Sequence, residues 1–170
     1  MTSDGGGGET EVSALREALY RGDNEAARAL VDAGATVNVF DAAALGDDAR
    51  LREALTAEPG TAMAWSADGF TALHLAAFLG GVDAVALLLD HGADVGAVSQ
   101  NPMTVQPLHS AAARGDVESC RLLLDHGANA NAAQQGGFTP LDAALHAHDE
   151  PLRALLETYG AIASGNVAAE

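Results

Sequence analysis

The sequence contains a single cysteine, Cys120, no lysine, few aromatic residues and no long uninterrupted apolar run. One cysteine excludes an internal disulfide, and its position in the leucine-rich segment 119–124 predicts a small buried thiol rather than a reactive one. A membrane-spanning helix needs roughly 18 consecutive apolar residues, and we find neither such a span nor a signal-peptide pattern. We therefore expect a cytoplasmic protein that does not insert into a membrane.

Basic residues are scarce relative to acidic ones. The chain has 24 acidic and 8 basic residues, every basic residue is an arginine, and the formal net charge is -16. Such a surface repels phosphate backbones and anionic lipids, which argues against nucleic acid or a membrane as the partner. A protein with a basic or mixed surface is the expected partner, and we expect the chain to be a monomer.

The apolar content favours helices. Apolar residues make up 48% of the sequence and aromatic residues only 4%, so the core must consist mainly of Ala and Leu. Both are strong helix formers, and β-branched residues are sparse. We therefore predict an all-α protein.

The chain repeats itself with the period of a solenoid. Leu73-His74 recurs as Leu108-His109 and as Leu141-Asp142, at steps of 35 and 33 residues. A glycine usually follows the Leu position by seven residues, and by that offset Val39 matches Leu73 in an earlier unit. A second marker of the form Asp-His-Gly-Ala lies near the end of the units. These markers define five units, at residues 14–38, 39–68, 69–102, 103–136 and 137–163.

The repeated segments resemble the ankyrin repeat family. GFTALHLAA, VQPLHSAAARGD and GGFTPLDAAL are similar to its Thr-Pro-Leu-His signature, and LLLDHGADV and LLLDHGANANA are similar to the ending of its second helix. FDAAALGDDARLREAL, the segment 101–103 and QPLHSAAARGD further resemble small bacterial ankyrin-only proteins. The resemblance implies an ankyrin solenoid of about five helix-turn-helix units with short hairpin fingers over residues 11–163. It leaves a disordered Gly-rich N-terminus at 1–10 and a C-terminal tail at 164–170.

Local signals agree with such a unit. Thr71 can cap the helix that follows it, Pro140 suits a first helical turn, and Gly80 is placed to end an inner helix. The step from Leu15 to Val39 is only 24 residues, too short for a full finger, so we expect the groove to be open at its N-terminal end. The finger at 99–106 carries two extra residues and a proline, which predicts a longer and stiffer middle finger.

His74 lies in the middle of an apolar run, so it could be a catalytic base, a metal ligand or a structural residue. The resemblance implies that His74 and His109 are structural residues that form hydrogen bonds between the loop and the start of the helix. Asp142 occupies the same position in the fifth unit, where its side chain could also accept a hydrogen bond from the local backbone. His146 and His148 are two residues apart on a predicted helix and do not point at one metal. We expect no catalytic residue, no metal site and no cofactor.

The resemblance implies that partners bind to the finger tips and to the exposed face of the inner helices. Large side chains outside the repeated framework are therefore the candidate contacts. Phe70 and Phe138 have an alternative role in packing finger against finger, and Asp68 has one as a solvated charge, whereas Trp65 and Phe78 are the favoured anchors. When each finger is counted with the helices that follow it, the candidates are Trp65, Asp68, Phe70, Phe78 and Leu79 in the third unit, Gln100, Asn101, Met103, Ala113 and Arg114 in the fourth, and Gln135, Phe138 and His146 in the fifth.

Two functions follow from the sequence. The first is a non-catalytic protein-protein interaction module with an aromatic groove and an acidic rim. The alternative is a small-molecule or enzymatic site in the groove near Trp65 and Phe78, with Asp68 and His146 as the available chemistry. A closed pocket beside Trp65 and Phe78 would favour the alternative, and an open aromatic strip would favour the protein-binding module.

Overall fold

The protein is a solenoid of helical hairpins. The structure is a computed structural model that describes residues 11–165, so the N-terminus 1–10, for which disorder is expected, and residues 166–170 of the expected tail lie outside the described residues. In the described part, ten α-helices pair into five hairpins without a named strand, which confirms the all-α repeat. The hairpins are α1 (Ala14–Tyr20) with α2 (Asn24–Asp32), α3 (Val39–Leu45) with α4 (Asp48–Ala57), α5 (Ala72–Leu75) with α6 (Val82–Asp90), α7 (Pro107–Arg114) with α8 (Val117–Asp125), and α9 (Pro140–His146) with α10 (Glu150–Thr158).

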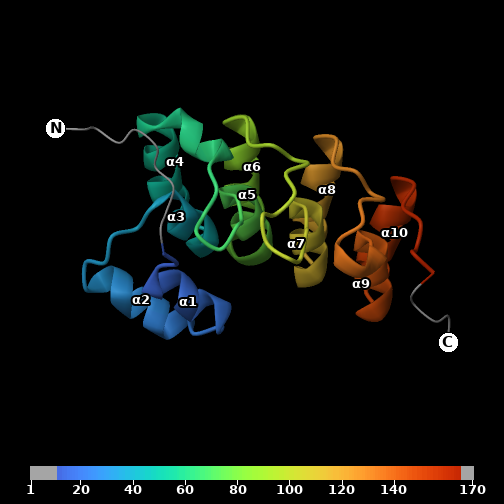
Figure 1. Cartoon of the computed structure of the whole chain (residues 1–170), viewed down its shortest axis with the longest axis horizontal. Helices are drawn as coiled ribbons and strands as arrows, with labels where there is room; N and C mark the ends of the chain where they lie inside the picture. Colours follow the sequence, from blue (N-terminus) through green and yellow to red (C-terminus); the bar gives the residue numbers. More distant parts are fainter. Residues whose placement is uncertain (1–10, 166–170) are drawn as a thin grey trace.

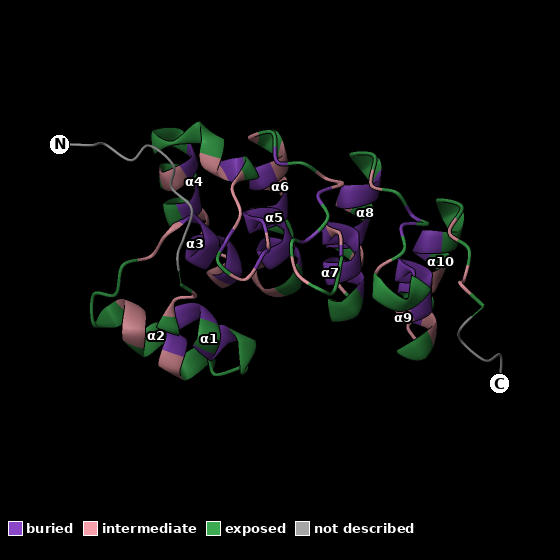
Figure 2. Cartoon of the chain, in the orientation of Figure 1, coloured by how far each residue is buried: buried purple, intermediate pink, exposed green. Residues whose placement is uncertain are grey.

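Short helical turns complete the units. The 3-10 turns η1 (Pro59–Met63) and η3 (Gln135–Gly137) lie in the connections, and the π turn η2 (Ala76–Gly80) extends α5. Inner helices α3, α5, α7 and α9 form one layer and outer helices α4, α6, α8 and α10 form the other (Figure 1). The core lies between these layers, where the ribbon is buried (Figure 2).

Small side chains let the inner helices approach closely. Ala76, Ala77 and Ala111 are fully buried, and Leu73 and Leu108 fill the space towards the outer helices. Burying a leucine side chain contributes about 1.5–3 kcal/mol, so this repeated pair of residue types accounts for much of the packing energy in each unit. Because each layer covers only one face of its neighbour, the hairpins are stable as a stack.

Each inner helix starts with a buried polar side chain at its third position. In the third unit, the Thr71 side chain accepts the His74 N–H, and Nδ1 of His74 accepts the Thr71 N–H at 3.2 Å. This reciprocal capping box satisfies two backbone donors that the helix leaves without partners. The side chains at this position, all buried, are Arg16, Asp41, His74, His109 and Asp142.

The two histidines at this third helical position also form hydrogen bonds with the finger that follows. Nε2 of His74 donates to the Val105 carbonyl at 3.0 Å, and Nε2 of His109 donates to the Ala132 carbonyl at 2.9 Å. Both ring nitrogens are therefore engaged, which fixes each imidazole in one neutral tautomer. Burial lowers the pKa of His74 to about 4 and also lowers the pKa of His109.

Asp142 performs the same role with a charged group. Its carboxylate accepts the Thr139 N–H at 2.8 Å and the Ser164 N–H at 3.0 Å. Burial by itself would raise the pKa of Asp142, but the hydrogen bonds from Ser164 and Thr139 lower it overall. The buried carboxylate thus stays ionised and joins the last inner helix to the chain beyond α10.

The second unit shows a different register from the one the glycine offset predicts. Val39 was matched to Leu73, but the capping box between Asn38 and Asp41 makes Phe40 the equivalent of Leu73. Phe40 is buried accordingly. The match was wrong by one residue because the cap, rather than the glycine, sets where the helix begins.

Glycines at the end of the inner helices permit close contact between units. Gly80 is the last residue of η2, and a Cβ added to it would lie 2.0 Å from the Ala43 carbonyl oxygen. The left-handed turn is made by the next residue, Gly81, at φ 104°. Gly80 is therefore needed for the packing of η2 on α3, and Gly81 for the turn.

The first hairpin departs from the row. Helix α1 packs on α3, but α2 lies away from α4, and the pair sits on the inner-helix side of the solenoid (Figure 1). The connection at residues 33–38 has no finger, as the short step predicts. The expectation of an open N-terminal end to the groove was wrong, because α1 places Tyr20 beside the inner helices and forms a wall there.

The buried imidazoles predict an acid-sensitive fold. The native state keeps His74 neutral down to about pH 4, whereas an unfolded histidine takes up a proton near pH 6.5. The free energy of unfolding should be fully retained above pH 6.5 and should fall by about 3 kcal/mol for His74 as the pH drops to 4. Urea unfolding of the wild type and of a His74→Gln, His109→Gln variant across this range measures the slope.

The double variant should be less stable at neutral pH and flatter between pH 6.5 and 4. Asp142→Asn is the control: because the pKa of Asp142 is lowered below 3.8, its contribution is lost only at lower pH. An unchanged slope in the double variant would contradict the role assigned to the imidazoles.

Candidate functional site

A pocket of about 440 Å³ lies on the inner-helix side, where the first hairpin meets the fingers. Its walls come from α1, from the finger that precedes α5, from α5 and η2, from the middle finger, and from α7. The lining residues are Tyr20, Phe70, His74, Leu75, Phe78, Met103, Val105, His109, Ser110, Ala113 and Gln134. The pocket therefore brings together four predicted partner contacts, Phe70, Phe78, Met103 and Ala113.

The mouth of the pocket consists of exposed apolar side chains. Met103 is 50% exposed, Phe78 is 43% exposed and Tyr20 is 39% exposed. Phe70 is half-buried, with its ring 5.8 Å from the His74 ring. Exposed rings that converge on one hollow are typical of a surface that is covered by a ligand or a partner.

Two polar side chains of the pocket wall, His74 and His109, are already engaged. The imidazoles of His74 and His109 each accept a backbone N–H and donate to a carbonyl. Burial lowers the pKa of both, so both are neutral at neutral pH. Neither offers a free lone pair or proton, which leaves the pocket without an activated base, nucleophile or metal ligand from these two residues.

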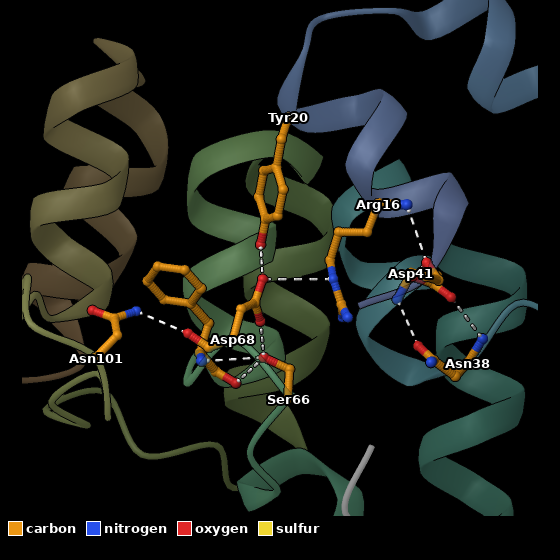
Figure 3. Close-up of polar contacts among 9 residues, drawn as sticks. Arg16, Tyr20, Asn38, Asp41, Ser66, Asp68 and Asn101 are labelled. Carbon is orange, nitrogen blue, oxygen red and sulfur yellow. Dashed lines mark hydrogen bonds and ion pairs between the residues drawn. The ribbon is translucent and has the colours of Figure 1, made fainter. Parts of the chain in front are cut away.

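Asp68 connects the first hairpin to the finger that precedes α5. Its Oδ2 accepts a hydrogen bond from the Tyr20 hydroxyl at 2.6 Å and lies 3.8 Å from Nε of Arg16 (Figure 3). The Ser66 hydroxyl binds the other carboxylate oxygen. Arg16 is fully buried, and its guanidinium also lies over the Phe40 ring at 5.7 Å. A charge buried this deeply needs a partner, and Asp68 supplies it.

Adjacent fingers are joined by backbone hydrogen bonds. The Gln100 N–H donates to the Gly69 carbonyl at 2.8 Å, and the Gln135 N–H donates to the Met103 carbonyl at 3.0 Å. The Asn101 side chain donates to the Asp68 carbonyl at 3.0 Å. Gly69 lies at φ 81°, and a Cβ there would be 2.9 Å from the backbone of Gln100. The finger tips therefore form one connected edge beside the pocket.

The middle finger is longer than its neighbours, as its sequence predicts. The Ser99 N–H donates to the Val105 carbonyl, six residues on, whereas the Gln134 N–H donates to the Phe138 carbonyl, four residues on. The two extra residues carry Met103 outwards, where it reaches the pocket. The length of this finger thus contributes directly to the site.

Arg114, which is exposed and lies outside the pocket lining, supports the pocket wall from the next unit. Its Nη1 donates to the carbonyl of Phe78 at 3.1 Å, across the gap between η2 and α7. This bond gives the Phe78 carbonyl a partner at the π turn, where the regular helical pattern is interrupted. The arginine holds the segment that carries the Phe78 ring.

The other predicted contacts lie outside the pocket lining. Trp65 is half-buried, with its ring 6.3 Å from the His74 ring and its backbone bridged to Thr71. Leu79 packs on the core, and Phe138 is 38% exposed on the last finger. Gln100, Gln135 and His146 are exposed. The structure thus separates Trp65, which packs on the scaffold, from the exposed Phe78.

Tyr20 is the exposed aromatic residue of the pocket that the sequence analysis missed, and Leu75, Val105, Ser110 and Gln134 were not predicted either. Repeat phase places it at the end of an inner helix, which carries no special signal. Its position at the pocket depends on how the first hairpin docks, and that docking rests on Arg16 and Asp68. The signal in the sequence that could have indicated this docking is Arg16, which occupies the helix position that His74 occupies in the third unit.

Other chemistry is sparse within residues 11–165. No group of three or more His, Cys, Asp or Glu side chains in this range is arranged to hold a metal ion. Cys120 is buried, and burial, reinforced by Asp116 and Asp149, raises the pKa of its thiol to about 12. Over the same residues, none of the helices has the length and apolar character that crossing a bilayer requires.

The Asp68 contacts predict that one substitution will loosen the first hairpin. Asp68→Asn removes the charge beside buried Arg16 and weakens the acceptor of Tyr20, which should lower the free energy of unfolding by about 2 kcal/mol. Amide hydrogen exchange should accelerate in residues 14–32 and stay unchanged in α9 and α10. Asp32→Asn, on the exposed surface of α2, is the control. Equal acceleration along the whole chain would show that Asp68 does not act on this hairpin in particular.

Comparison with known proteins identifies the fold. The profile described as "Ankyrin repeat" matches residues 68–100, and the profile described as "Ankyrin repeats (3 copies)" matches residues 98–166. A search of curated proteins found no match to the chain. Ankyrin repeats are generally protein-protein interaction modules and are typically non-enzymatic. The matched residues cover more than half of the sequence and coincide with the stacked hairpins from α5 onwards, and the chain therefore belongs to the ankyrin repeat family.

Proposed function

We propose that the protein is a non-catalytic binding module that holds a protein partner across its finger tips and the concave face of its inner helices. The observation that carries this proposal is the convergence of Phe70, Phe78 and Met103 on one pocket next to the connected fingers. Large apolar side chains in a central hollow are the usual hot spots of protein interfaces. Because backbone hydrogen bonds already order the fingers, little conformational entropy is lost when a partner docks.

The engaged imidazoles weigh against an enzyme. A general base needs a free lone pair within reach of a substrate. The Nδ1 lone pairs of His74 and His109 already accept hydrogen bonds from backbone N–H groups. The sequence alternative relied on Trp65, Phe78, Asp68 and His146. Among these, only Phe78 lines the pocket, and Asp68 is occupied by Tyr20 and Arg16.

A small apolar ligand is the second candidate. The volume of about 440 Å³ falls within the range of about 300–1,000 Å³ that is typical of small-molecule sites. The largely apolar walls would suit such a ligand. The protein-binding proposal is preferred because Phe78 and Met103 remain half exposed, so the apolar surface continues outwards onto the fingers.

The charge of the chain points to a basic partner. Ion pairs engage Arg50 with Asp47, Arg121 with Glu118, and Arg153 with Glu150 and Glu157. With 24 acidic and 8 basic residues in the sequence, acids outnumber arginines threefold. The resulting negative field attracts a basic or mixed protein surface and speeds its association.

Affinity capture from a lysate of the source cell tests the proposed surface. Phe78→Ala and Met103→Ala should each weaken binding of the captured protein by about 2 kcal/mol, while thermal unfolding changes little. Ile162→Ala removes an exposed apolar side chain that lies outside the pocket lining and should bind like the wild type. Loss of binding with the outer-helix changes Asp83→Ala or Glu118→Ala, but not with Phe78→Ala, would place the interface on the convex side.

Salt dependence tests the contribution of the acidic surface. Exposed charges mainly steer the encounter, so raising the salt concentration should slow association more than it speeds dissociation. Surface plasmon resonance with the captured partner at several salt concentrations separates the two rates. Association that does not depend on salt would show that the acidic residues do not contribute to recognition.

A further inference from the structure

We propose that the pocket receives one aromatic or large aliphatic side chain from a basic segment of the partner protein, and that Tyr20 is the wall that limits the size of this side chain. The inference rests on the proposed function and specifies its partner. It assigns to the first hairpin, which lies outside the residues that match the family profiles, a direct part in recognition.

The walls require an apolar side chain. Tyr20, Phe70, Phe78 and Met103 surround the hollow, and none of the lining residues is an Asp, Glu, Lys or Arg. The imidazoles at the floor are neutral and already bonded. A charged side chain that entered would lose its hydration without gaining a counter-charge, which costs several kcal/mol. An aromatic or large aliphatic side chain loses nothing comparable and gains contact with the rings.

The net charge of the protein indicates which residues should flank the inserted side chain in the partner segment. The formal net charge of -16 favours Lys or Arg on either side of the inserted residue. A second copy of this chain carries the same negative charge, so repulsion disfavours self-association through the pocket. A basic segment of a different protein is therefore the occupant that fits both the apolar hollow and the net negative charge of the chain.

Tyr20 reaches the pocket from a different element than the other lining side chains. It is the last residue of α1, and its hydroxyl donates to Oδ2 of Asp68 at 2.6 Å (Figure 3). The same oxygen lies 3.8 Å from Nε of buried Arg16, so the hairpin is held at two points on one carboxylate. The ring is thereby fixed opposite the fingers. Asp68 acts through Tyr20 and is a positioning residue rather than a contact of the partner.

A phage-displayed library of random linear peptides, panned against the full chain, provides the probe. Enriched peptides should share an aromatic or large aliphatic residue flanked by Lys or Arg. The best peptide is then made with Trp, Leu or Ala at that residue, and its affinity is measured by calorimetry. Phe78→Ala should weaken the Trp and Leu peptides about 30-fold, and Ile162→Ala should not.

The selectivity between the Trp and Leu peptides tests whether Tyr20 limits the size of the inserted side chain. Tyr20→Ala enlarges the pocket, so the ratio of the affinities for the Trp and Leu peptides should shift towards Trp by about tenfold. Asp68→Asn should shift this ratio in the same direction, and Tyr20→Phe, which keeps the ring, should shift it less. A general loss of stability would weaken all peptides equally and would leave the ratio unchanged.

Cross-linking gives a result that does not depend on how the variants fold. The best peptide, with a photoreactive benzoylphenylalanine at the inserted residue, should label the wild type at Tyr20, Phe78 or Met103. Labelling elsewhere, or an unchanged ratio with both Tyr20→Ala and Asp68→Asn, overturns the inference and leaves the protein-binding function standing. If no peptide is enriched and the dye anilinonaphthalene sulfonate binds in a Phe78-dependent manner, both proposals fail and a small-molecule site replaces them.

Discussion

The structure depends on one recurring interaction, the buried polar side chain at the third position of each inner helix. In the second to fifth units this residue exchanges hydrogen bonds with the residue that caps the helix, and in the third to fifth units it also binds the next finger or the chain beyond α10. Because an unpaired polar group in the core costs about 1–3 kcal/mol, the arrangement of each finger is tied to the start of the preceding helix. Packing of Ala and Leu alone would hold the helices together without fixing the fingers.

The first unit shows what changes when this residue changes. Arg16 stands where His74 stands two units later, and its long charged side chain extends to Asp68 instead of bonding within its own cap. The Asp41 carboxylate of the second unit accepts from the Ser13 hydroxyl at 2.6 Å, which ties the first cap to the second. The first hairpin therefore lies beside the row of hairpins (Figure 1), and its Tyr20 lines the pocket.

The pocket follows from this displacement and from the long middle finger. Its three sides belong to segments far apart in the sequence, with Tyr20 on α1, Phe78 on η2 and Met103 on the finger. The imidazoles of His74 and His109 and the Tyr20 hydroxyl already have hydrogen-bond partners, and the most exposed side chains at the mouth, Phe78 and Met103, are apolar. The formal net charge of -16 gives the chain a negative field, which under the proposed function attracts a basic partner.

The sequence by itself determined the repeat, the helical class, the cap at Thr71, the first helical turn at Pro140, and the exposed places of Phe78 and Met103. These features depend on contacts within a unit or between neighbouring units, and such contacts leave a periodic signal in the chain. Only the tertiary structure decided the register of Phe40, the half-buried place of Trp65 and the position of Tyr20 at the groove. The docking of the first hairpin rests on Arg16 and Asp68, which are 52 positions apart in the sequence. This pair is not repeated in the other units, so the repeat pattern of the sequence could not reveal the contact.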